Sequence, residues 1–319
     1  MEEHAMTVQF GLAINNFVGP DKTPDVDEIL RYSVRAEELG FESLWAWDHV
    51  LLGVKPAFPI LDSLSILTAI AMRTSRVKLG TGILVLPLRN PVVAAKVLGS
   101  LDQISKGRLI VGAAAGWYAR EFHAVGIPFK KRGKIFEQNL ELLLRLWTEE
   151  SVTAQVEGFD LLEAVLLPKP YQKPHPPVLI GGYVEAVLRR VARMGDGWLT
   201  YFYTAEGYTK SWTKIQTYAR EYGRDPNALT GTNQLAIYVG PPKAEADGPM
   251  RHWLTTEWDV ASWSDSTLEH AIRGTVEECV AQLQSHIDTG VHRIILIPYR
   301  YEPQQVELIA REVIPRLSP

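Results

Sequence analysis

Short apolar runs alternate along the chain with segments of helical periodicity. Between residues 25 and 39, for example, apolar residues recur at the spacing of one helix face, and Gly40 ends the pattern. Eight apolar runs predict strands, at residues 8–14, 41–47, 77–86, 109–115, 177–181, 197–202, 233–239 and 292–298. Periodic segments predict helices at residues 25–39, 61–73, 91–105, 134–147, 185–194, 206–222, 276–289 and 303–317.

The pattern is clearest between residues 77 and 126. An apolar run stops at Pro87, a helical segment follows, and a second apolar run ends at Gly116. Apolar strands joined by a helix are typical of a βαβ unit in a parallel sheet. Since no linker or repeat divides the 319 residues, we predict one α/β domain, a (β/α)8 TIM barrel. Ligands in such folds bind at the C-terminal ends of the strands.

Two stretches interrupt the alternation. Residues 241–270 begin with PPKAEADGP and carry Trp253, Trp258 and Trp263. We interpret them as an insertion after the seventh strand, at the active-site end, forming either a packed loop or a substrate lid. The connection at residues 150–177 ends in PKPYQKPHPP, which is too rich in proline for regular structure.

Composition narrows the class of protein. Hydrophobic residues make up 46% of the chain and charged residues 22%, which fits a soluble globular domain. The net charge of -4 gives no reason to expect a nucleic-acid or membrane partner. We interpret the one basic cluster, Lys130, Lys131, Arg132 and Lys134, as a solvated face.

The sequence shows no sign of export. Cys279 is the only cysteine, so no internal disulfide can form, and its helical surroundings favour a buried, inert thiol. No apolar run reaches the roughly 18–20 residues of a membrane span, and residues 1–7 do not resemble a signal peptide. We therefore expect a cytoplasmic protein.

Asp48 and His49 follow the second predicted strand, at the end where a ligand would bind. A histidine beside a carboxylate can serve as an acid/base pair, because its pKa lies near neutrality. From the residues alone, a structural role is also open, in which Asp48 caps the turn and His49 packs.

Glycines mark two further positions. Gly80-Thr81-Gly82-Ile83 lies inside the third predicted strand, where glycine indicates a bulge or a close backbone approach. Gly181-Gly182 precedes a predicted helix, whose free N–H groups suit a phosphate.

Motifs of several other enzyme classes are absent from the sequence. It contains no metal-ligand spacing, no P-loop, no GxSxG elbow and no GxGxxG fingerprint.

Three segments, GTGILVLPLRNP, LDQISKGR and GAAAGWYAREFHAVG, follow one another in the order seen in a known family. They resemble the bacterial luciferase-like flavin-dependent oxidoreductases. That family uses reduced FMN or the deazaflavin coenzyme F-420 in a (β/α)8 barrel. The resemblance extends from about residue 8 to about residue 314.

The resemblance implies roles for particular residues. It ties His49, with Asp48 before it, to flavin-oxygen or hydride chemistry. It implies a non-proline cis peptide at Gly82–Ile83 behind the flavin ring. The remaining cofactor-binding candidates are Trp47, Thr81, Gly116, Trp117, Tyr118, Gly181, Gly182, Tyr183 and Trp198.

Two positions depart from the family pattern. Ala115 stands where bacterial luciferase has an arginine for the phosphate, and Tyr183-Val184 stands where the family often has Asn or Ser. The cofactor phosphate therefore lacks an obvious side-chain anchor in the sequence.

We interpret the chain as a reduced-FMN-dependent monooxygenase acting on a small organic substrate. This choice over the deazaflavin rests on the absence of an obvious cationic cluster for the deazaflavin's anionic tail. The alternatives are an F-420-dependent hydride-transfer enzyme and a non-catalytic flavin-binding barrel. The expected partners are a small-molecule substrate, a separate flavin reductase and a second copy of the chain.

Overall fold

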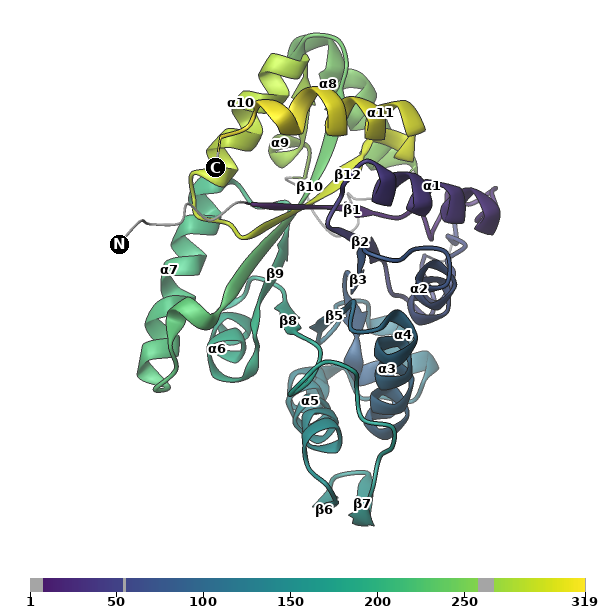
Figure 1. Cartoon of the computed structure of the whole chain (residues 1–319), viewed down its shortest axis with the longest axis vertical. Coiled ribbons are helices and arrows are strands. Elements are labelled where there is room, and N and C mark those ends of the chain that lie inside the picture. Colours follow the sequence, from purple (N-terminus) through teal and green to yellow (C-terminus); the bar gives the residue numbers. More distant parts are fainter. Residues whose placement is uncertain (1–7, 54–55, 258–266, 319) are drawn as a thin grey trace.

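Eight parallel strands form a closed barrel with helices around it (Figure 1). The computed structural model describes residues 8–53, 56–257 and 267–318. The strand β12 pairs with both β1 and β10, and β9 pairs with β10, so the sheet closes. The barrel strands, in order, are β1 (Gln9–Ala13), β2 (Ser43–Ala46), β3 (Lys78–Thr81), β5 (Leu109–Ala114), β8 (Val178–Gly181), β9 (Gly197–Tyr201), β10 (Thr230–Val239) and β12 (Arg293–Pro298). The predicted fold is confirmed.

Helices cover the outside of the barrel, and polar side chains fix where several of them begin. Asp25 accepts a hydrogen bond from the N–H of Glu28, and Asn90 accepts one from that of Val92, with Pro91 in the first turn. The helices are α1 (Val26–Glu38), α2 (Ser63–Ala71), α3 (Pro91–Ser105), α4 (Ala119–Ala124), α5 (Arg132–Thr148), α6 (Glu185–Met194), α7 (Ala205–Glu221), α10 (Val276–Ile287) and α11 (Pro303–Leu308). The short helix α4 was not predicted.

Alternating side chains of the strands fill two separate apolar layers. One set points into the barrel and includes Trp45, Ile110, Leu179, Leu199 and Ile295. The other set packs under the helices and includes Leu44, Val111, Ile180, Leu235 and Leu296. Cys279 belongs to the outer layer, and burial raises the pKa of its thiol to about 12. The strands read as continuous apolar runs because both of their faces are buried.

The third predicted strand is interrupted rather than continuous. It divides into β3 and the short β4 (Leu84–Val85), with a cis peptide bond between Gly82 and Ile83 at the break. The expected cis bond is therefore confirmed. Glycine is required at position 80, because an added Cβ would lie 2.3 Å from the indole of Trp45.

The two irregular stretches contain more structure than expected. An antiparallel hairpin, β6 (Val152–Val156) and β7 (Phe159–Ala164), projects from the barrel, and the proline-rich residues after it are irregular, as expected (Figure 1). The other stretch forms α8 (Lys243–His252), a π-helical turn (Trp253–Glu257) and α9 (Thr267–His270), followed by β11 (Ile272–Gly274), which pairs with β10. Trp258 and Trp263 lie outside the described residues.

Candidate active site

A cavity of about 820 Å³ opens at the C-terminal ends of the barrel strands. Its volume suits a bound cofactor with a small substrate. Among the residues that line it are eleven of the candidates from the sequence: Trp47, Asp48, His49, Gly82, Ile83, Gly116, Trp117, Tyr118, Gly181, Gly182 and Tyr183. None of the described residues of the insertion after β10 lines the cavity.

Thr81 and Trp198 lie outside the cavity lining and support it from behind. The hydroxyl of Thr81 is buried and donates to the carbonyl oxygen of Gly112 at 2.8 Å, which ties β3 to β5. The indole N–H of Trp198 donates to the carbonyl oxygen of Gly182 at 2.6 Å, and its ring stacks on Tyr208. Trp198 therefore holds backbone that lines the cavity, and Thr81 holds together two strands that end there.

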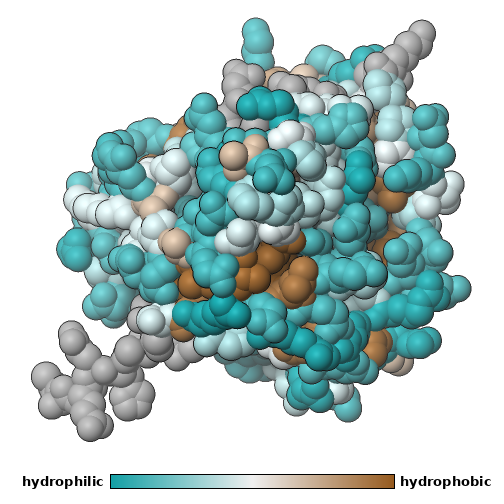
Figure 2. Space-filling view, turned by 90° about the horizontal axis from the view of Figure 1, so that it is seen from above, coloured by the Kyte–Doolittle hydropathy of each residue, from teal (hydrophilic) through white to brown (hydrophobic). Residues whose placement is uncertain are grey.

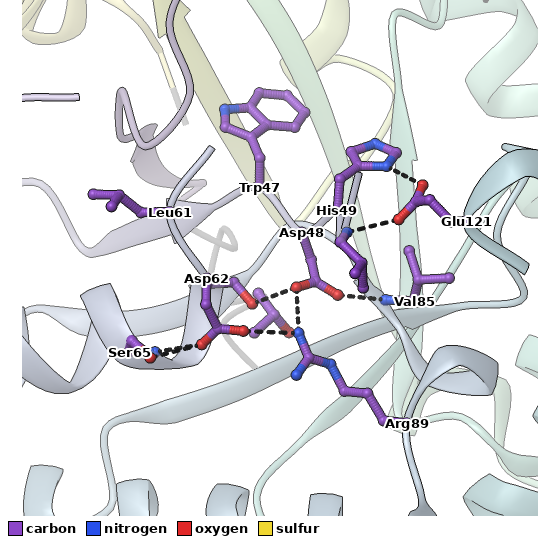
Figure 3. A network of polar contacts seen from close by, with 12 residues as sticks. Trp47, Asp48, His49, Leu61, Asp62, Ser65, Val85, Arg89 and Glu121 are labelled. Atoms are coloured by element: carbon purple, nitrogen blue, oxygen red, sulfur yellow. Dashed lines mark hydrogen bonds and ion pairs between the residues drawn. The ribbon is translucent and has the colours of Figure 1, made fainter. Parts of the chain in front are cut away.

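His49 is paired with Glu121, a residue that the sequence analysis did not single out. The distance from Nδ1 of His49 to Oε1 of Glu121 is 2.6 Å, and the N–H of Val50 donates to the other carboxylate oxygen at 2.7 Å (Figure 3). Glu121 comes from α4 and is only 1% exposed. The rings of Trp117 and Tyr118 contact the imidazole edge-on. The orientation of the imidazole is thus fixed on several sides.

Asp48 does not pair with His49, so the predicted pair of adjacent residues is not formed. Its side chain extends away from His49 toward Arg89 (Figure 3). It accepts hydrogen bonds from Nη2 of Arg89 at 2.6 Å, from Oγ of Ser63 at 2.8 Å and from the N–H of Val85 at 2.9 Å. Burial would lower the pKa of Arg89, but Asp48 and a second carboxylate raise it above its usual value. Asp48 therefore joins the ends of β2 and β4 to α2.

One end of the cavity is cationic. Lys130, Arg132 and Arg190 line it together with the N-terminus of α6, which has no side-chain cap. Nε of Arg132 donates to the carbonyl oxygen of Gly116 at 3.0 Å, and Nε of Arg190 donates to Glu137 at 2.6 Å. Free helix N–H groups with nearby cations are the donor set that an anionic phosphate requires. The residues present therefore fit a cofactor with a phosphate-bearing tail.

The interpretation of the basic cluster as a solvated face is correct for only part of it. Lys131 and Lys134 lie on the surface, where both approach the exposed carboxylate of Glu157. Lys130 and Arg132 instead contribute to the cavity. Sequence spacing could not separate these residues, because they span a turn and the first residues of α5, whose orientation depends on the packing of the barrel.

The opposite side of the cavity is largely apolar, with Phe17, Trp47, Leu52, Phe58 and Ile60 in its lining. Trp47 is held firmly. Its indole N–H donates to the hydroxyl of Tyr301 at 3.1 Å, and the amide of Asn16 bonds both its backbone N–H and its carbonyl oxygen. Tyr301 in turn packs edge-on against Trp253 of the insertion.

Tyr201 and Gln234 add polar groups that the sequence analysis also missed. They lie opposite each other on β9 and β10 and both line the cavity. Burial, with a smaller effect of Tyr183, raises the pKa of Tyr201, so its hydroxyl stays neutral. Gln234 could have been noticed as a polar residue at an inward position of an apolar strand.

Other classes of site are not seen in the described part of the chain. Residues 8–53, 56–257 and 267–318 contain no group of three His, Cys, Asp or Glu side chains that could hold a metal ion. No helix among them is long and apolar enough to cross a membrane. On the face shown in Figure 2, hydrophilic residues surround a hydrophobic patch near the centre.

A family model described as luciferase-like monooxygenase matches residues 6–293. The chain belongs to this family. Its members include enzymes that use FMN and enzymes that use coenzyme F-420, and this chain is an oxidoreductase of that kind. The resemblance seen in the sequence is thereby confirmed.

Individual relatives cover nearly the whole chain. An F420-dependent glucose-6-phosphate dehydrogenase from Amycolatopsis mediterranei is 25% identical, over 91% of this chain and 94% of the relative. An FMNH(2)-dependent dimethylsulfone monooxygenase from Pseudomonas putida is 24% identical, over 91% and 88% of the two chains. The crystal structure of a monooxygenase from Streptomyces bottropensis, at 25% identity, has a TM-score of 0.80 and covers 97% of this chain and 99% of its own.

Proposed function

We propose that this protein is an F-420-dependent oxidoreductase that interconverts a small alcohol and its carbonyl product. The observation that carries the proposal is the pairing of His49 with the buried Glu121 in a cavity that also has a cationic end. When bound, the deazaflavin supplies the hydride chemistry, because it can accept a hydride or donate one. The protein has to bind the anionic tail, hold the substrate carbon near the ring and move one proton.

His49 is suited to move that proton. An ionised carboxylate can only accept hydrogen bonds, so Glu121 keeps the histidine proton on Nδ1 and leaves Nε2 free to accept another. The substrate alcohol then loses its hydroxyl proton to Nε2 as its carbon gives up a hydride. In the reverse direction the same nitrogen returns the proton to the carbonyl oxygen.

The cationic end of the cavity supports the deazaflavin as the cofactor. Its tail carries several negative charges, and Lys130, Arg132 and Arg190 meet them beside the N-terminus of α6. The sequence-based preference for FMN depended on the absence of such a cluster, so that argument no longer holds. The F-420 enzyme from Amycolatopsis mediterranei, similar over nearly the whole chain, supports the same choice.

A reduced-FMN monooxygenase is the second candidate. It is supported by Gly181-Gly182 at the N-terminus of α6, which suits a single terminal phosphate, and by the monooxygenases among the relatives. This function would require a separate flavin reductase. A non-catalytic barrel is disfavoured, since binding alone gives no reason to bury a carboxylate behind His49.

Cofactor binding tests the proposal. The purified protein is titrated with oxidised F-420, with oxidised FMN and, without oxygen, with reduced FMN. We expect F-420 to bind at least about tenfold more tightly, because its tail adds charge-assisted contacts. The loaded protein should then reduce the cofactor with a panel of small alcohols, without oxygen. Tight binding of reduced FMN alone, with substrate-dependent oxygen consumption, would instead establish the second candidate.

A further inference from the structure

Gln234 reaches across the barrel to the cis peptide. It lies on β10, which is four strands away from β3 in either direction around the barrel. A Cβ added to Gly82 on the far side would lie 2.8 Å from the amide nitrogen of Gln234. The side chain therefore forms part of the cavity floor, above the apolar interior that includes Trp45.

The side-chain amide of Gln234 makes no hydrogen bond to residues 8–53, 56–257 and 267–318, and its polar atoms are not among the buried unpaired ones, so they reach the cavity. The residue is only 2% exposed, and what remains exposed faces the cavity. Most of this polar side chain is packed against protein that offers the amide no partner, a cost that an apolar residue of similar size would not have. The unpaired amide therefore indicates a polar ligand above it.

The floor leads from Gln234 toward the phosphate-binding end. Gln234 touches Gly82, Ile83 follows Gly82 in the chain, and a Cβ on Gly181 would lie 2.3 Å from Cδ1 of Ile83. Gly181 directly precedes the N-terminus of α6. A ligand with its phosphate at that helix would therefore extend its ring along this floor to Gln234.

We propose that Gln234 binds the heterocyclic ring of the cofactor, with its amide oxygen accepting from a ring N–H and its NH2 donating to an adjacent ring carbonyl. This rests on the proposed function only in that the cavity holds a deazaflavin or flavin. Both rings carry the same edge of adjacent carbonyl and N–H groups, which an amide complements with one donor and one acceptor. Gln234 thus recognises the ring independently of the tail.

The test measures dissociation constants rather than turnover. Oxidised F-420 and FMN are titrated into the wild type, Gln234→Leu and Gln234→Glu, with the visible absorption band of the bound cofactor recorded. Riboflavin and a tail-less 5-deazaflavin serve as ring-only probes. Loss of both hydrogen bonds in Gln234→Leu should weaken the ring-only probes and the intact cofactor by the same factor, about 10–100-fold, and shift the band.

Thr232→Val is the matched control, because Thr232 is buried on the same strand with an unpaired hydroxyl but does not line the cavity. It should bind every ligand as the wild type does. Circular dichroism confirms that each variant is folded. Unchanged ring binding in a folded Gln234→Leu, or an effect confined to the KM of the substrate, would overturn the assignment of Gln234 to the ring.

The same titration separates this inference from the proposed function. If the wild type binds only FMN and Gln234→Leu weakens it, the deazaflavin proposal fails while the role of Gln234 stands. If F-420 binds tightly and Gln234→Leu does not change its affinity, the deazaflavin proposal stands and the role of Gln234 fails. A wild type that binds neither ring overturns both.

Discussion

His49 and Glu121 are 72 residues apart in the sequence, yet 2.6 Å separates Nδ1 of the imidazole from Oε1 of the carboxylate. The histidine follows β2 and the glutamate belongs to α4, so the barrel brings together the ends of two strands that are not neighbours. The pair leaves Nε2 as the nitrogen that can exchange a proton with a substrate.

Glu121→Gln should lower turnover by about 10–100-fold, because the amide no longer fixes the tautomer of His49 or stabilises its charged form. The melting temperature should change little, whereas a purely structural role would lower it without lowering turnover per folded molecule. Steady-state rates and thermal unfolding of the same variant provide the measurement. Glu141→Gln, an exposed change on α5, is the control and should behave as the wild type.

His49→Ala should lower turnover by about 10²–10⁴-fold, the range for a positioned proton-transfer group. Cofactor affinity should change far less, since the cationic residues lie at another part of the cavity. His49→Asn should be poor as well, because an amide cannot carry a proton near neutral pH. A packing role predicts the opposite, a lower melting temperature with normal turnover per folded molecule, so both quantities are measured on one variant.

The two arginines on α6 that bind Glu137 make a matched pair of variants. Arg190 lines the cavity, whereas Arg193 lies one turn later and is exposed. Arg190→Ala should weaken cofactor binding by about 5–50-fold at low salt and by less at high salt, because the contact is charge-assisted. Arg193→Ala should leave the affinity unchanged. Equal effects of both changes would show that Arg190 acts only through Glu137.

Asp48→Asn should mainly reduce stability. It removes the buried one of the two carboxylates that pair with Arg89 and leaves only the more exposed Asp62 beside a largely buried guanidinium, and such losses cost about 3 kcal/mol. Urea unfolding measures the change. The double variant Asp48→Asn with Arg89→Met should recover part of the loss, because the buried cation is removed and the carboxylate that remains, Asp62, is half-exposed. A fully stable Asp48→Asn with reduced turnover would instead assign Asp48 to the chemistry.

The alternation of strands and helices could be predicted from the sequence because burial on both faces makes every barrel strand apolar. The hydrogen-bond and ion-pair partners of individual side chains could not be predicted. Asp48 and His49 are adjacent, but their side chains leave the end of β2 in different directions. Lys130 and Lys131 are also adjacent, and only Lys130 lines the cavity. These outcomes depend on turns whose geometry is set by tertiary packing.

Acid should remove the contribution of Glu42 to stability. Burial alone would raise the pKa of this carboxyl, but the guanidinium of Arg293, at 2.9 Å, and Lys78 lower it from 4.5 to about 2. A lowered folded-state pKa means that the contribution is fully present above about pH 4.5 and is lost as the pH falls toward 2. The size of this contribution is up to about 3 kcal/mol.

Urea unfolding of the wild type and Glu42→Gln at pH 7, 4 and 3 should therefore give a difference in stability that shrinks at the lowest pH. Glu42 precedes β2 and does not line the cavity, so turnover of the folded variant at pH 7 should be normal. A stability difference that stays constant across this pH range would show that packing, and not the charge of Glu42, is what the substitution removes.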